Sequence, residues 1–181
     1  MSLDGFVTGP DPTPEQQLGE GGDVLFRWMS DPAPGGEALL ADLRAEIGAL
    51  LMGRIGYDLA GWQDGGPVGK VPCFVVTHKA PDPDTVAAKD VFTFVDDGLE
   101  SAVAQAKAVA GPDRMVGVHG ASLVPQLLDA GLLDGILIHL APVLLGSGIR
   151  LFEHLGRQVR LERESVLTTP TTTHLRFRVL A

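Results

Sequence analysis

Strand-like and helix-like segments alternate between residues 37 and 141, and this alternation restricts the possible folds more than any other feature of the chain. Helical segments joining strands usually leave those strands parallel, so the pattern predicts an α/β fold with a mostly parallel central sheet and helices on both faces. Short apolar runs, typical of buried strands, lie at residues 49–52, 73–77, 91–95, 115–118 and 136–141. Segments with apolar residues on one helical face lie at 37–49, 96–111 and 122–130.

The last third of the chain follows a different pattern. Strands are predicted at 159–167 and 173–180, and the turn Thr168-Thr169-Pro170 between them indicates an antiparallel hairpin at the sheet edge. The clearest helix of the chain lies before this region. Its predicted N-cap is the pair Asp96-Asp97, and Gly111 is predicted to end it.

Length and composition predict one domain over residues 1–181. A chain of 181 residues with 45% hydrophobic content can bury one substantial core. Its single cysteine, Cys73, excludes an internal disulfide and suits a reducing compartment. The longest apolar stretch, 132–145, is interrupted by Asp134 and His139 and is too short to span a bilayer. The start of the chain has no signal-peptide pattern, so we expect a cytoplasmic protein without a membrane partner.

The charge of the chain argues against a nucleic-acid partner. The net charge is −9 and the pI is near 4.9, whereas phosphate backbones are bound by clustered Lys and Arg. An anionic small molecule would therefore have to be held locally, by a well-placed cation and by backbone amides.

Two glycine-bearing turns have the chemistry to do this. Met52-Gly53-Arg54 joins a predicted strand to a helix, where glycine admits a phosphate and arginine can bind it with two hydrogen bonds. The segment His119-Gly120-Ala121-Ser122-Leu123 has the same position after another strand. Each turn could equally be a plain connection. A serine-hydrolase elbow is excluded at the second turn, because Val124 stands where that motif needs glycine.

Other candidate motifs are weaker. The segment 145–148, Leu-Gly-Ser-Gly, lacks the third glycine of a dinucleotide fingerprint, since Leu151 takes its place. The five histidines, His78, His119, His139, His154 and His174, show no metal-ligand spacing, so no metal site is predicted. By spacing alone, Asp4 before Gly5 indicates a turn.

Taken together, these segments resemble the dihydrofolate reductase-like superfamily, in the branch that contains the riboflavin-biosynthesis pyrimidine reductase domain of the bifunctional deaminase-reductase. The resemblance covers nearly the whole chain. The segments that carry it are Met1-Ser2-Leu3-Asp4-Gly5-Phe6, Met52-Gly53-Arg54, Phe74-Val75-Val76-Thr77-His78, His119-Gly120-Ala121-Ser122-Leu123, Ala130-Gly131-Leu132-Leu133-Asp134 and the run from Pro142 to Gly148 with Leu151-Phe152.

The resemblance implies a three-layer α/β/α fold, NADPH as hydride donor and a homodimer. It assigns the ribose 2′-phosphate to Arg54 and substrate orientation or proton relay to Asp4. Its other cofactor contacts fall on Gly53, Thr77, His78, Gly120, Ala121, Ser122 and Leu123.

The chain departs from the family pattern at three places. Threonine is usual where Gly56 stands, a glycine pair is usual at His119-Gly120, and relatives carry an edge strand before the Ser2-Leu3-Asp4-Gly5 segment. The leading hypothesis is an NADPH-dependent reductase of a small heterocyclic substrate, pyrimidine or pterin-like. The alternatives are a dimeric nucleotide-binding module without turnover and a scaffold that has lost its cofactor.

Overall fold

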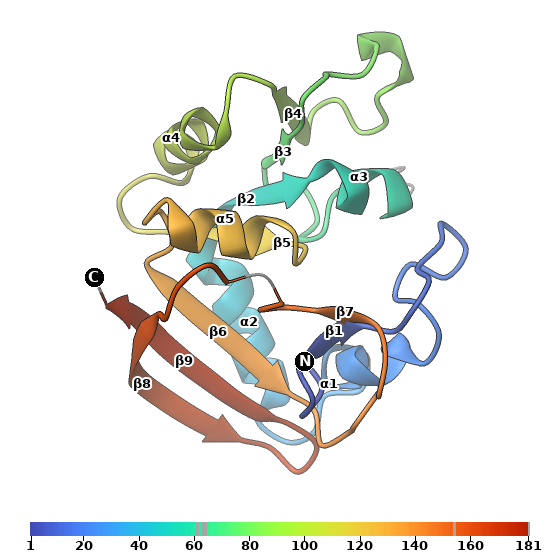
Figure 1. The fold of residues 1–181 in the computed structure, drawn as a ribbon, viewed down its shortest axis with the longest axis vertical. Helices are drawn as coiled ribbons and strands as arrows, with labels where there is room; N and C mark the ends of the chain where they lie inside the picture. The colour runs from blue at the N-terminus through green and yellow to red at the C-terminus, as the bar shows by residue number, and fades with distance from the viewer. Residues whose placement is uncertain (61, 63–64, 154, 181) are drawn as a thin grey trace. The chain divides into compact units, whose positions relative to one another are not determined.

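The computed structural model describes residues 1–60, 62, 65–153 and 155–180. The chain forms two compact units (Figure 1). One unit contains residues 1–40 and the chain from residue 124 onward, and the other contains residues 41–123. The predicted α/β class is confirmed, because one sheet is parallel and strands and helices are mixed along the chain. The single domain over residues 1–181 stays a prediction.

The unit of residues 41–123 is built on a four-stranded parallel sheet. Its strand order is β4-β3-β2-β5, and neighbouring strands run parallel throughout. The strands are β2 (Ile47–Gly53), β3 (Cys73–Val76), β4 (Phe92–Val95) and β5 (Met115–His119). The helices of this region are α2 (Gly36–Glu46), which begins in the other unit, α3 (Arg54–Ala60), η2 (Pro83–Thr85) and α4 (Leu99–Ala110).

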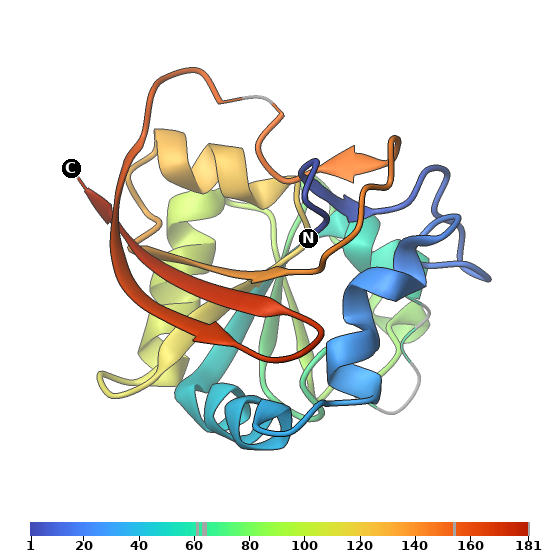
Figure 2. The same ribbon diagram turned by 90° about the horizontal axis from the view of Figure 1, so that it is seen from below.

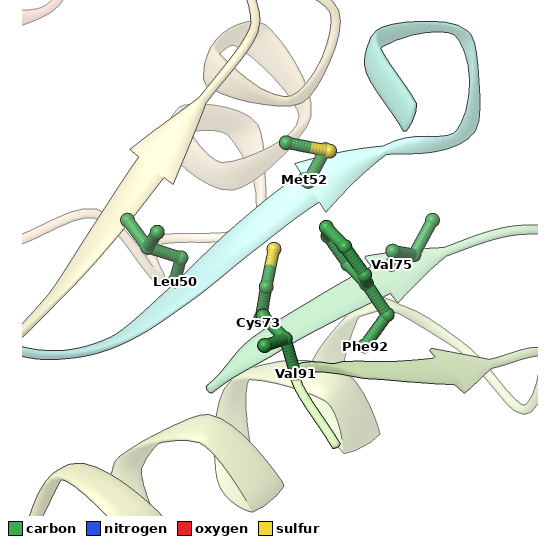
Figure 3. Packing of buried hydrophobic residues seen from close by; sticks show 6 residues of the cluster. All are labelled: Leu50, Met52, Cys73, Val75, Val91 and Phe92. Carbon is green, nitrogen blue, oxygen red and sulfur yellow. The ribbon is translucent and has the colours of Figure 1, made fainter. Parts of the chain in front are cut away.

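Apolar side chains cover both faces of this sheet, as expected for parallel strands. On one face, side chains from β2, β3 and β4 converge into a buried cluster (Figure 3). Tyr57 of α3, with Trp62, Val68 and Val71 from the following segment, packs against that cluster. The helix α4 packs on β2, β3 and β5. A Cβ at Gly48 would lie 2.8 Å from the Cα of Ala110 on α4, so glycine permits this close approach.

The start of α4 differs from the prediction. Its N-cap is Gly98, with no side-chain hydrogen bond, and not the predicted pair Asp96-Asp97. The Asp97 carboxylate instead accepts a hydrogen bond from the Ser101 hydroxyl at 2.9 Å, so it has a side-chain partner inside the first turn. The predicted end is confirmed, because Gly111 is the C-cap with φ 76° and its N–H donates to the Lys107 carbonyl.

The other unit contains a three-stranded antiparallel sheet in the order β6-β9-β8 (Figure 2). The predicted C-terminal hairpin is confirmed, with β8 at the sheet edge. The remaining elements of this unit are a small antiparallel ribbon and short helices. The strands are β6 (Gly135–Leu140), β8 (Arg160–Thr168), β9 (Thr173–Leu180), β1 (Phe6–Thr8) and β7 (Ile149–Arg150), and the helices are η1 (Gly22–Phe26), α1 (Arg27–Ser30) and α5 (Leu123–Asp129).

The strand predicted at 136–141 forms, but its pairing differs from the expected pattern. It pairs antiparallel with β9 instead of extending the parallel sheet. Alternation along the sequence predicts that a strand exists, whereas its partner depends on which backbone edge is near it. In the part of the chain that the structure describes, no helix has the length and apolarity needed to cross a membrane.

Candidate functional site

Three strands of the parallel sheet end at the same edge. Gly53 at the end of β2 lies beside Val76 of β3, and Met52 pairs with His119 at the end of β5. The segments that follow these strands, which begin at Arg54, Thr77 and Gly120, therefore start along one carboxyl edge. In open α/β sheets this is the edge at which ligands bind. The prediction that the Arg54 and Gly120 turns lie side by side is confirmed.

The two turns approach each other closely because residue 53 is glycine. A Cβ at Gly53 would lie 2.7 Å from the Ser122 hydroxyl oxygen and 3.8 Å from Cγ of Leu123. Gly120 has φ +97°, and a Cβ there would meet nothing within 4 Å. The first glycine permits the close approach, and the second provides an open backbone turn. Backbone N–H groups in such a turn are suited to a phosphate group.

Arg54 lies at this edge but is already paired. Its Nε donates to both carboxylate oxygens of Asp58, at 2.8 and 2.9 Å, and its Nη1 donates to the Lys79 carbonyl at 3.1 Å. The two charged side chains are 36% and 51% exposed. Arg54 is thus held on an accessible surface, and a carboxylate partly neutralises its charge.

The chain leaves β3 in a turn organised by Thr77. The Thr77 hydroxyl donates to the Lys79 carbonyl at 3.0 Å and accepts from the Lys79 N–H at 3.3 Å. The same carbonyl accepts the bond from Arg54, so the β3 and β2 exits share one acceptor. His78 is exposed in this turn.

The two departures at Gly56 and His119 are neighbours in the structure. A Cβ at Gly56 would lie 3.8 Å from Nδ1 of His119, and the Trp62 ring lies edge-on to the imidazole at 6.3 Å between centroids. Desolvation lowers the pKa of His119 although part of the residue is exposed. The imidazole is therefore neutral at pH 7, so it can donate or accept a hydrogen bond at this edge.

Asp4 belongs to the other unit, where its carboxylate ties two loops together. Its oxygens accept hydrogen bonds from the N–H groups of Leu145, at 3.1 Å, and Gly146, at 2.7 Å. The Arg150 guanidinium donates to the Asp4 carbonyl and lies 4.2 Å from the centre of the Phe6 ring.

These contacts determine the charge of Asp4. A hydrogen bond from the Ser2 side chain, followed by the two backbone hydrogen bonds, lowers the pKa of Asp4 to about 2. The carboxylate is therefore ionised at neutral pH. This state suits electrostatic orientation of a substrate better than a proton relay, for which a pKa near the working pH is preferred.

A partly buried histidine pair in the same unit was not found from the sequence. His139 and His174 face each other across β6 and β9, with their Nδ1 atoms 2.7 Å apart, and Trp28 stacks on His139 with ring centroids 4.0 Å apart. One Nδ1 donates and the other accepts, so the accepting ring must be neutral, and burial lowers the pKa of both histidines, which favours neutral rings. Desolvation, with smaller effects from His174 and the amino group of Met1, lowers the pKa of His139 to about 3. Only the register of β6 and β9 brings the two rings together. His154, one of the five histidines that show no metal-ligand spacing, lies outside the described residues.

Solved structures of similar fold place this geometry in a known class. A crystallised protein from Shewanella sp. PV-4, named for riboflavin biosynthesis, matches with a TM-score of 0.75 at 22% identity, over 100% of this chain and 96% of that protein. RibD from Acinetobacter baumannii matches with a TM-score of 0.61 at 18% identity, over 99% of this chain and 56% of RibD. The chain therefore has the reductase-type α/β fold seen in RibD proteins, and it spans just over half of that RibD.

Sequence comparison narrows the class to a family. The model of the RibD C-terminal domain matches residues 1–175, so the chain belongs to the RibD C-terminal domain family. The uncharacterized protein YwjB of Bacillus subtilis (strain 168) is 25% identical over 162 residues, which cover 89% of this chain and 83% of YwjB.

Proposed function

We propose that the protein is an NADPH-dependent reductase of a small heterocyclic substrate, pyrimidine or pterin-like, similar to 5-amino-6-(5-phosphoribosylamino)uracil reductase. Family membership supports the reaction class. The observation that carries the proposal is the close approach of two strand-to-helix turns at one carboxyl edge, where a Cβ at Gly53 would lie 2.7 Å from the Ser122 hydroxyl oxygen. These two turns and the adjacent guanidinium of Arg54 fit the phosphate groups of a dinucleotide.

Each predicted contact then has a role. The turn Gly120-Ala121-Ser122-Leu123 and Gly53 hold the pyrophosphate through backbone N–H groups, and Arg54 binds the ribose 2′-phosphate. Thr77 and His78 flank the cofactor where β3 ends. When bound, NADPH supplies the hydride, so the protein's task is to bind and orient both reactants.

Asp4 orients the substrate in this proposal. Its amide-bound carboxylate keeps a negative charge at neutral pH, which suits a hydrogen-bond donor on a pyrimidine or pterin ring. The fixed charge contributes through position and not through transfer of a proton.

Titration with NADPH and NADH tests the proposal directly. Nicotinamide fluorescence is followed on the wild type and on Arg54→Ala, and we expect NADPH binding that weakens markedly in the variant. Slow oxidation of NADPH by a panel of pyrimidines and pterins, measured at 340 nm, tests turnover. The matched control is Arg114→Ala, which removes an exposed cation between α4 and β5, at the opposite end of the sheet.

A nucleotide-binding module without turnover is the second candidate. The position of His119 near Gly56 motivates it, because a bulky imidazole there changes the edge at which the nicotinamide would react. NADPH binding without oxidation by any compound of the panel would favour this candidate. A lack of binding by either nucleotide would leave a scaffold that has lost its cofactor.

The proposal includes a homodimer acting in the cytoplasm. All nine residues of the edge strand β8 are exposed, and an unpaired strand edge is a natural pairing surface. The buried thiol of Cys73 is compatible with a reducing compartment. Light scattering coupled to size-exclusion chromatography measures the oligomeric state, and a monomer at micromolar concentration would contradict this part of the proposal.

A further inference from the structure

Asp58, the ion-pair partner of Arg54, has no role in the proposed function so far. Asp58 lies one helical turn after Arg54 on α3, so the two side chains share a face of the helix. The carboxylate receives the Arg54 Nε–H on both oxygens, at 2.8 and 2.9 Å. The Lys79 carbonyl accepts a hydrogen bond from Nη1 of Arg54. Two acceptors therefore engage the guanidinium before any ligand arrives.

We propose that Asp58 determines cofactor specificity by lowering the preference for a 2′-phosphate over a 2′-hydroxyl. As a result, the protein binds NADPH and NADH with affinities within about tenfold of each other. The inference rests on the proposed function, because it assumes that Arg54 faces the adenosine ribose. It concerns the size of the preference for NADPH over NADH in this chain.

The argument is electrostatic. A phosphate bound by Arg54 would share one guanidinium with the Asp58 carboxylate, so two anionic groups would lie well inside one screening length of about 8 Å. The phosphate carries up to two negative charges and is repelled. A ribose hydroxyl is neutral and can donate a hydrogen bond to a carboxylate, as it does to an acidic residue in NAD-binding folds.

A competing effect has the opposite sign. Asp58 also holds Arg54 in place, and this would help phosphate binding. The pair is half exposed, and exposed ion pairs contribute little to holding a side chain in one position. Repulsion of a doubly charged group is the larger effect, so removing the charge of Asp58 should raise the preference for NADPH.

The test compares dissociation constants for NADPH and NADH on Asp58→Asn and on the wild type. We expect the ratio of the NADH constant to the NADPH constant to rise about tenfold in Asp58→Asn, which corresponds to ~1.4 kcal/mol. The preference for NADPH in the variant should also fall more steeply with added salt. Asp113→Asn makes the same change in net charge between α4 and β5, and its ratio should equal that of the wild type.

Two further variants separate charge from positioning. Asp58→Glu keeps the charge and should keep the wild-type ratio. Arg54→Ala/Asp58→Asn removes both charges and should bring the two constants together. The melting temperature of each variant checks that it is folded.

The outcomes distinguish this inference from the proposed function. A wild type that prefers NADPH by more than about tenfold, or a ratio that falls or stays constant in Asp58→Asn, would overturn the role of Asp58 while NADPH binding stands. A wild type that binds neither nucleotide would overturn both.

Discussion

The two units place their polar side chains in opposite ways. Among the described residues, the buried polar residues, Ser2, Thr169, Thr172 and His174, all belong to the unit of residues 1–40 and 124 onward. In the unit of residues 41–123 the buried side chains are apolar, and the polar candidates Arg54 and His78 lie at the carboxyl edge of the sheet.

This contrast has a structural cause and a consequence. A parallel sheet covered on both faces leaves polar groups only at its strand ends, which is where a ligand can reach them. The antiparallel unit holds polar groups inside, some of them paired, as the Nδ1 atoms of His139 and His174 are, whereas Nε2 of His174 has no hydrogen-bond partner among the described residues. We therefore expect the parallel unit to respond to changes at its edge and the antiparallel unit to respond to pH.

The largest expected effect tests the parallel unit of residues 41–123. Met52→Ala empties a fully buried position in the sheet and should lower the free energy of unfolding by about 2–5 kcal/mol. Because no charge is involved, the loss should be the same at pH 7.5 and pH 5.5. Urea unfolding at the two pH values measures it, and a loss that depended on pH would contradict the contrast between the units.

The second-largest effect is expected from acid, which should lower the stability of the antiparallel unit. The unfolded chain protonates His139 near pH 6.5, whereas in the folded protein the pKa of His139 is about 3. The unfolded state therefore binds more protons between these values, and stability falls as the pH falls through this window. Between pH 7 and pH 5 the expected loss is about 2 kcal/mol.

A variant without the His139–His174 pair provides the control for this prediction. In His139→Phe/His174→Leu the loss between pH 7 and pH 5 should be much smaller. Hydrogen exchange should show protection falling at pH 5 in β6 and β9 before β2 and β3. Equal losses of protection in both sheets would show that the histidine pair is not the source.

A smaller effect is expected at the sheet edge. Gly53→Ala places a methyl group 2.7 Å from the Ser122 hydroxyl oxygen, so the Ser122 side chain or the turn that carries it must shift. We expect nucleotide affinity to fall about tenfold while stability changes by about 1 kcal/mol. The variant Gly53→Ala/Ser122→Gly removes the clash and should recover part of the affinity. Unchanged affinity in Gly53→Ala would argue against binding of the phosphate groups by these two turns.

The smallest effect is expected in the Asp4 loop. Asp4→Asn keeps one carbonyl acceptor but loses the charge, so exchange of the Leu145 and Gly146 amides should become faster with little change in melting temperature. Because the pKa of Asp4 is about 2, no activity change of the wild type between pH 5 and pH 8 should come from this residue. A titration in that range that disappears in Asp4→Asn would contradict the assignment.

Much of the parallel unit could be predicted from the sequence. The strands around Leu51 and Val75 were found because they are short apolar runs, and the shared edge of Arg54 and Gly120 follows from parallel pairing. The helix cap at Gly98 was not predicted. The Asp97 carboxylate could accept from a backbone N–H of the helix or from the Ser101 hydroxyl, and the sequence does not show that it accepts from Ser101.

Long-range partners decided the rest. The sequence by itself determined most of the strands and helices, although not the short strands β1 and β7, and which turns carry glycine and arginine. Those properties depend on neighbours within a few residues. Only the tertiary structure decided that β6 pairs with β9, that His139 meets His174 and that His119 lies beside Gly56. These contacts depend on register and on side-chain direction between segments far apart in the chain, and no local pattern encodes either of them.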